Sequence, residues 1–378
     1  MPEIKIEGIT KTFGQKKILD NVTFEVKSGT ITSIVGPAGA GKSTLLKTIA
    51  GIEKPDSGKI IIDGKDVTNL PPKDRNVSMV FQTYALYPHM TVYENIAFPL
   101  KVKKVPVAEI DKRLKEIAEM LNITHILNRR IFEISGGEAQ RTALARALIK
   151  GSEIILLDEP LTNLDYKIRE KMRGELKKIA GQSKEAVWIY ATPDAREALA
   201  ISSHVVVLHE GKVRQCGQID DIYQHPKNLV VASYFSYPRL NTFECDFMRI
   251  GNESYIRELT GLFRLKIDVE QNIEHLKDKN YIVGIRPTDV KLSKENKSML
   301  PLPGTIKLIE LMGSDTVMYV DTQVTPASKP IEVVVFCPEV LTEYQIGQRI
   351  VLYFDPRDAF IFEKESGDFI SKGEPVYS

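Results

Sequence analysis

The sequence predicts an α/β protein of two domains, in which a sheet wrapped by helices is followed by a smaller, β-rich domain. Three observations lead to this prediction. The chain has 378 residues, more than one typical domain. Strand and helix patterns alternate up to about residue 235, and helical periodicity fades after about residue 236. We therefore expect a first domain at 1–235 and a second at 236–378.

The first domain is expected to open on a strand, because MPEIKIEGITKTFG alternates like one. The apolar runs Ile31–Val35 and Ile154–Leu157 are typical of buried central strands. Helices are expected at three places, after Lys42, after Gly137 and after Asp165. The stretch Val107–Leu121 is amphipathic at helical spacing, which indicates a packing face. Its apolar stripe consists of Ile110, Leu114, Ile117 and Leu121.

The second domain is predicted from short β-branched runs that alternate with turns. These runs are Tyr281–Ile285, Thr316–Val320, Ile331–Phe336 and Ile350–Phe354. Such spacing favours a small barrel of the oligosaccharide- and oligonucleotide-binding (OB) type. The segment SYPRLN at 236–241 is the expected linker.

Composition narrows the class of protein. Lys and Arg number 51 against 50 Asp and Glu, so the formal net charge is +1, without the basic excess usual in nucleic-acid-binding proteins. The three cysteines, Cys216, Cys245 and Cys337, form no CxxC pair, and we expect them to be buried small hydrophobes. No window approaches about 18 uninterrupted apolar residues, so any role at a membrane would be that of a peripheral partner.

The strongest motif is a phosphate-binding loop. Residues 36–44 match the pattern GxxxxGK[ST] between a buried strand and a helix-forming run. The backbone N–H groups of such a loop face phosphate oxygens, a lysine reaches the β- and γ-phosphates, and a hydroxyl binds Mg²⁺. The expected nucleotide-binding residues are Gly36, Pro37, Ala38, Gly39, Ala40, Gly41, Lys42, Ser43 and Thr44, with Ser43 also a metal ligand.

Two carboxylates follow the apolar run Ile154–Leu157, at the strand end where ligands gather in α/β sheets. Asp158 is suited to a Mg²⁺ shell, because hard cations prefer oxygen. Glu159 is suited to polarise an attacking water as general base. Such a pair is also common in solvated turns, and the upstream loop favours the functional interpretation.

Together with further motifs, these residues make the sequence closely similar to the ABC ATPase family. Gln82 lies in VFQTYALYPHMTVYENIAF, which resembles the family's Q-loop and coupling surface. Ser135, Gly136 and Gly137 resemble the signature motif, and Asp165 resembles the last residue of the D-loop. The resemblance implies that Gln82 has a catalytic and a metal-binding role, and that the three signature residues contact the γ-phosphate held by an opposite subunit.

The resemblance also places Phe13 where an aromatic ring stacks on adenine, and a flat π-face suffices for stacking. From spacing alone, Phe13 could equally be a core aromatic.

The implied fold is a P-loop ABC ATPase domain with a helical subdomain at about 84–150, followed by the β-rich OB-type domain. Gly284–Pro287 and Glu310–Asp315 look like parts of the regulatory domain of maltose-type sugar-importer ATPases. The implied protein uses ATP and Mg²⁺, forms an ATPase dimer, and docks on two membrane permease subunits at the cytoplasmic face. Importers of anions, iron or polyamines share this plan, so other solutes stay open.

One position departs from the family pattern. The family has a switch histidine after the strand that follows the D-loop helix, and this chain has Pro193 there; none of its six histidines aligns with the position. Proline offers neither an imidazole nor a backbone N–H. We expect a site that binds ATP but hydrolyses it poorly. The chain could then pair with a histidine-bearing subunit, act as a slow homodimer, or be compensated locally, for instance by Thr192.

Two other functions are alternatives to that of an ATPase that drives an importer. A soluble ABC protein acting on DNA or ribosomes usually has tandem cassettes or inserted arms, and this chain has one cassette and no charge excess. A nucleotide-sensing subunit without catalysis would also account for Pro193. Measured ATP turnover separates the sensor from the motor.

Overall fold

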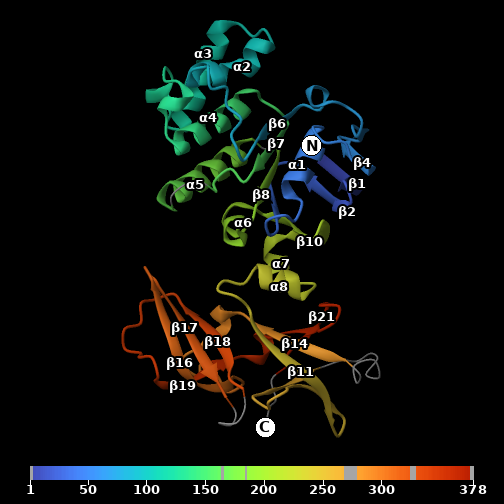
Figure 1. The fold of residues 1–378 in the computed structure, drawn as a ribbon, viewed down its shortest axis with the longest axis vertical. Coiled ribbons are helices and arrows are strands. Elements are labelled where there is room, and N and C mark those ends of the chain that lie inside the picture. Colours follow the sequence, from blue (N-terminus) through green and yellow to red (C-terminus); the bar gives the residue numbers. More distant parts are fainter. Residues whose placement is uncertain (1–2, 163–165, 184, 268–278, 324–328, 375–378) are drawn as a thin grey trace. The chain divides into compact units, whose positions relative to one another are not determined.

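The computed structural model describes residues 3–162, 166–183, 185–267, 279–323 and 329–374. The chain divides into two compact units, Met1–Ile222 and Tyr223–Ser378. This division falls before the expected boundary at residue 235. Figure 1 shows the helices and strands of both units.

The first unit is built on a six-stranded sheet with the order β10-β9-β3-β8-β7-β6. Its neighbours pair in parallel, except that β10 pairs with β9 antiparallel. The strands are β3 (Ile31–Val35), β6 (Val77–Val80), β7 (Ile154–Asp158), β8 (Val187–Thr192), β9 (His204–His209) and β10 (Lys212–Gln218). A second, antiparallel sheet has the order β2-β1-β4-β5 and consists of β1 (Glu3–Phe13), β2 (Lys16–Lys27), β4 (Ser57–Ile62) and β5 (Lys65–Asp66).

Both predicted central strands are confirmed, and every residue of β3 and β7 is buried. In β7, Ile154 and Leu156 belong to one hydrophobic cluster, whereas Ile155 and Leu157 belong to the other. Successive side chains of a strand point to opposite faces, so a strand covered on both faces is largely apolar. The charged residue of β7, Asp158, stands at its end.

The helices of the first unit begin close to the predicted places. They are α1 (Lys42–Ala50), α2 (Val92–Val102), α3 (Val107–Met120), α4 (Gly136–Ile149), α5 (Tyr166–Gln182), α6 (Ala195–Ile201) and, across the division, α7 (Ile219–Gln224). The helices α2, α3 and α4 pack together, within the range expected for the helical subdomain (Figure 1). The predicted stripe on α3 is confirmed as a packing face, because Ile110, Leu114 and Leu121 are buried and Ile117 packs against them.

The second unit is β-rich, as predicted. One sheet has the order β13-β12-β11-β14-β20-β21 and the other β15-β19-β16-β17-β18, and all recorded pairs are antiparallel. The strands are β11 (Asn241–Ile250), β12 (Glu253–Glu258), β13 (Arg264–Ile267), β14 (Asn280–Ile285), β15 (Val290–Lys291), β16 (Leu300–Met312), β17 (Asp315–Thr322), β18 (Ile331–Cys337), β19 (Arg349–Phe354), β20 (Phe360–Glu363) and β21 (Phe369–Lys372). Residues from both sheets form one hydrophobic cluster, so this unit has its own core.

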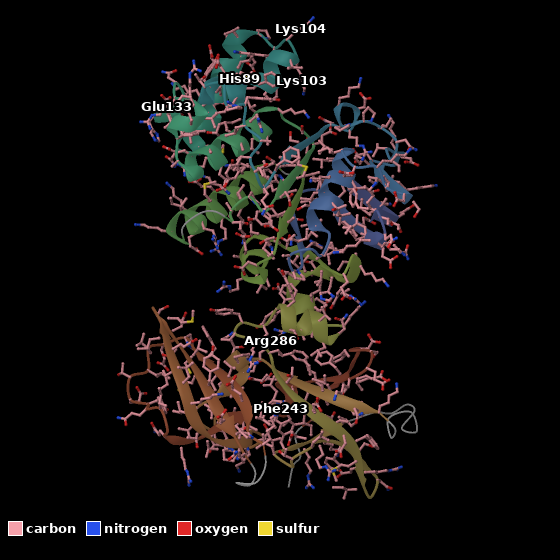
Figure 2. All side chains as sticks on the ribbon, in the orientation of Figure 1. His89, Lys103, Lys104, Glu133, Phe243 and Arg286 are labelled. Atoms are coloured by element: carbon pink, nitrogen blue, oxygen red, sulfur yellow. The ribbon has the colours of Figure 1, made fainter. Side chains whose placement is uncertain are left out.

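The segment 223–240, which precedes the first strand of the second unit, packs with that unit. Ala232 of α8 (Leu229–Tyr234) clusters with Leu240, Phe360 and Phe362. Arg286, labelled in Figure 2, lies 3.9 Å from the ring centroid of Tyr223. These contacts explain why the compact unit begins before residue 236.

One prediction about the cysteines is wrong. Cys245 and Cys337 are buried, but Cys216 is exposed. Cys216 lies on β10, which is an edge strand of the central sheet. A side chain on an edge strand can face solvent, which the spacing of cysteines alone does not reveal.

Candidate nucleotide-binding site

The loop between β3 and α1 requires its glycines. Gly39 and Gly41 have φ values of +80° and +106°, which side chains rarely tolerate. A Cβ on Gly36 would lie 2.0 Å from the carbonyl oxygen of Leu208, and one on Gly41 would lie 2.8 Å from that of Ile18. The glycines therefore allow the loop to lie against neighbouring backbone.

This loop forms part of a cavity of about 440 Å³. Phe13 lines it with 47% of its surface exposed, so the alternative of a core aromatic is wrong. Among the described residues, the lining consists of Phe13, Lys16, Ile18, Ala38, Gly39, Gly41, Lys42, Ser43, Thr44, Gln82 and Glu159. Segments far apart in the sequence thus meet at one cavity.

Lys42 is the buried lysine of this cavity and is only 4% exposed. Its Nζ donates hydrogen bonds to the carbonyl oxygens of Gly36 (2.9 Å) and Pro37 (3.1 Å). The same Nζ lies 3.4 Å from Glu159 Oε1. A buried ammonium needs such partners, and phosphate oxygens would replace them well.

The three predicted metal ligands, Ser43, Gln82 and Asp158, each have a hydrogen-bond partner in this region. Ser43 Oγ donates to Asp158 Oδ1 at 2.9 Å, and Gln82 Nε2 donates to Glu159 Oε2 at 3.2 Å. Burial raises the pKa of Asp158, although the hydrogen bond from Ser43 opposes this shift. A buried carboxylate beside a hydroxyl offers the hard oxygen ligands that Mg²⁺ prefers, so these residues fit the ion.

Glu159 lies just beyond β7 in an unusual conformation, with φ at +50°. Its backbone N–H donates to the carbonyl oxygen of Ala191 at 3.0 Å. Ala191 belongs to β8, and Asp158 is its partner in the ladder between β7 and β8. The adjoining strand therefore holds the backbone of the predicted general base.

Ser135, Gly136 and Gly137 lie at the start of α4, and none of them lines the described cavity. Ser135 is the N-cap, and its Oγ accepts a hydrogen bond from the backbone N–H of Glu138 at 3.3 Å. Glu138 Oε2 accepts in return from the backbone N–H of Ser135 at 2.8 Å. Asp165 lies outside the described residues.

This reciprocal capping was missed from the sequence, although the S-x-x-E spacing at the start of α4 signals it. In the structure the carboxylate of Glu138 stabilises the helix start, and the hydrogen bond from the backbone of Ser135 lowers its pKa.

Pro193 directly follows β8. The adjacent Thr192 is 1% exposed, and its Oγ donates to Glu197 Oε2 at 2.5 Å. The same oxygen accepts a hydrogen bond from the backbone N–H of Asp194 at 3.1 Å. A hydroxyl has one proton to donate, so this arrangement does not favour compensation by Thr192.

Comparison with known proteins identifies the family. The model of the ABC transporter family matches residues 19–162, and that of the TOBE domain matches 283–362. The trehalose/maltose import ATP-binding protein MalK of Thermococcus litoralis is 37% identical over 98% of this chain and 100% of its own length. The chain belongs to the ABC transporter family. It is an ATP-binding import subunit of that family, an ATPase that uses ATP and Mg²⁺.

Other ABC proteins support this conclusion. The oligosaccharides import ATP-binding protein MsmX of Bacillus subtilis is 36% identical over 97% of this chain and 99% of its own. The spermidine/putrescine import ATP-binding protein PotA of Vibrio cholerae is 38% identical over 79% of this chain and 78% of its own. A dimeric structure of the ATP-binding cassette MJ0796 bound to ADP and Pi has a TM-score of 0.53 and 32% identity, and covers 57% of this chain and 98% of that one.

No described helix of the chain is both long and apolar enough to cross a membrane. The family indicates an ATPase of an importer, and the solved MJ0796 cassette is a dimer.

Proposed function

We propose that this chain drives a sugar importer from the cytoplasmic face of the membrane. The relatives MalK and MsmX support sugar, since their similarity extends over 98% and 97% of the chain and so includes its β-rich part. The similarity to PotA extends over 79%. A polyamine importer is therefore the second candidate for the solute.

Docking on the permease subunits is supported by the segment after Gln82. Arg146 of α4 donates to the carbonyl oxygens of Ala85 and Tyr84, both at 2.9 Å, and so ties this segment to the helical part. Beside it lies a cleft of about 450 Å³, and its lining includes the apolar side chains of Met79 and Phe98. His89 and Lys103, labelled in Figure 2, belong to this region. A cleft with apolar lining can bind a segment of another protein.

The chain's own site is further proposed to bind ATP but to hydrolyse it slowly. The observation that carries this is Pro193 directly after β8, two residues beyond Ala191, whose carbonyl oxygen accepts from the backbone N–H of Glu159. Loss of one positioned donor to the transition state typically lowers a rate by about a hundred- to a thousandfold. Lys42 and Ser43, which we propose to hold the triphosphate, line the cavity, and this supports retention of ATP binding.

Steady-state ATPase activity of the purified chain with Mg²⁺ tests this, beside the variant Pro193→His. We expect a nearly inactive wild type that binds ATP, and a variant that gains activity. Ordinary turnover by the wild type would contradict a degenerate site. It would instead favour a homodimeric motor.

Slow hydrolysis favours pairing with a second, histidine-bearing ATPase subunit over pairing of two identical chains. Ser135, Gly136 and Gly137 of this chain would complete the partner's site. Both kinds of pair would be closed by a two-fold or pseudo-two-fold axis, as dimers commonly are. Purification of the tagged chain with its permease distinguishes the two: the heterodimer predicts a second ATPase chain in equal amount, and the homodimer predicts none.

A further inference from the structure

Glu197 is a buried carboxylate outside the nucleotide cavity. It lies in the first turn of α6 and is only 6% exposed. Burial raises its pKa, because a carboxylate loses hydration inside a protein. Its Oε2 accepts the hydrogen bond from the Oγ of Thr192 at 2.5 Å. Such a group is costly to bury and needs its partner.

Thr192 is the last residue of β8, so its hydrogen bond connects Glu197 to the end of that strand. Its Oγ also accepts from the backbone N–H of Asp194, and Asp194 in turn caps α6 by accepting from the backbone N–H of Arg196. Residues 192–194 are thus tied to α6 by two successive hydrogen bonds. The residue before Thr192 is Ala191, whose carbonyl oxygen receives the backbone N–H of Glu159.

Glu159 depends on that backbone contact. A glutamate with φ at +50° is in a sparsely populated conformation that persists only when neighbouring groups determine it. On its other side, the Oγ of Thr162 donates to the carbonyl oxygen of Glu159 at 3.2 Å. With the backbone held on both sides, the carboxylate lies between Lys42 and Gln82.

We propose that Glu197 is a positioning residue for ATP hydrolysis. It fixes Thr192, and thereby the end of β8 that holds the backbone of Glu159 in its left-handed conformation. The link from Glu197 to Glu159 stands on the geometry of this chain. Only the last step, in which Glu159 acts as general base, rests on the proposed function.

Residue-resolved hydrogen exchange of the nucleotide-free, full-length chain tests the link directly. Glu197→Ala and Thr192→Val should speed exchange of the Glu159 amide by about tenfold or more, because they loosen its acceptor strand. The amide of Leu156, in the middle of β7, reports global unfolding and should not change. Thr192→Ser keeps a hydroxyl donor and Glu197→Gln keeps an oxygen acceptor, so both should retain protection.

Because we expect slow hydrolysis by the wild type, single-turnover hydrolysis is measured beside ATP affinity in the Pro193→His background to test the consequence. In Glu197→Ala we expect hydrolysis to slow by up to about a hundredfold while ATP affinity stays within about twofold, since small misplacements of a reacting group act on the rate. An unchanged Glu159 amide in Glu197→Ala overturns the proposal. Faster exchange without slower hydrolysis overturns the positioning role. If the wild type does not bind ATP, the proposed function is wrong. The link from Glu197 to Glu159 is still tested, because hydrogen exchange is measured without nucleotide.

Discussion

Gly41 combines two requirements that only glycine meets. Its φ is +106°, and an added Cβ would lie 2.8 Å from the carbonyl oxygen of Ile18 and 2.9 Å from Leu19. Gly39 has the same kind of backbone angle, +80°, but nothing lies within 4 Å of its Cβ position. The two glycines therefore separate backbone strain from steric crowding.

We predict that Gly41→Ala destabilises the first unit more than Gly39→Ala. Strain alone should lower the free energy of unfolding by about 1–2 kcal/mol in Gly39→Ala, whereas Gly41→Ala adds a displacement of neighbouring backbone. Trp188, the single tryptophan of the chain, is fully buried in β8 and reports unfolding of this unit by fluorescence. Gly136→Ala, with ordinary φ and open space, is the control. Equal losses in all three variants would contradict the steric argument.

At the start of α4, the residue that caps the helix, Ser135, is also one of those proposed to contact the nucleotide of a partner subunit. The capping bonds between Ser135 and Glu138 satisfy backbone donors that the first turn leaves unpaired. The Oγ of Ser135 also donates to Glu138 Oε2 at 2.9 Å. Contact between this hydroxyl and a partner's phosphate would therefore compete with an internal hydrogen bond.

Ser135→Ala should lower the free energy of unfolding of the first unit by about 1 kcal/mol, because it removes the cap acceptor. Glu138→Gln should cost less, because a glutamine oxygen can still accept from the backbone of Ser135. Denaturant titration followed by Trp188 fluorescence measures both. A larger loss in Glu138→Gln than in Ser135→Ala would show that the charge, and not the cap, matters.

Individual strands and residues show how much of the structure the sequence can predict. Buried strands such as β3 and β7 are predictable because burial on both faces favours a largely apolar run. Lys42, Ser43 and Glu159 are predictable because short motifs fix their spacing beyond the ends of two strands, β3 and β7. Glu197 was not predicted, because its role depends on a hydrogen bond to Thr192 and on a ladder to another strand. The exposure of Cys216 likewise depends on sheet order.

At the scale of the molecule, the expected boundary at residue 235 is the least predictable feature. The segment 223–235 has a helical pattern like that of the first unit. Its packing partners Phe360 and Phe362, however, lie near the end of the chain. Only the folded chain brings them together.

A fragment 219–378 should therefore be more stable than a fragment 236–378. The shorter one exposes Phe360 and Phe362, and we expect a free energy of unfolding lower by about 2 kcal/mol or more. Thermal unfolding followed by circular dichroism compares them, with the full chain as reference. Equal stability would place the boundary at residue 235 after all.

The nucleotide cavity of one chain is lined without Ser135, Gly136 or Gly137. In a pair that shares its sites, this separation has a genetic consequence. A copy disabled at Lys42 and a copy disabled at Ser135, brought together, would concentrate both defects in one site and leave the other intact. In a pair of identical chains, two alleles that are each inactive alone should thus complement one another, whereas two defects on the same side of the site should not. In a pair with a different ATPase subunit, the two mutant copies never meet, and complementation should fail.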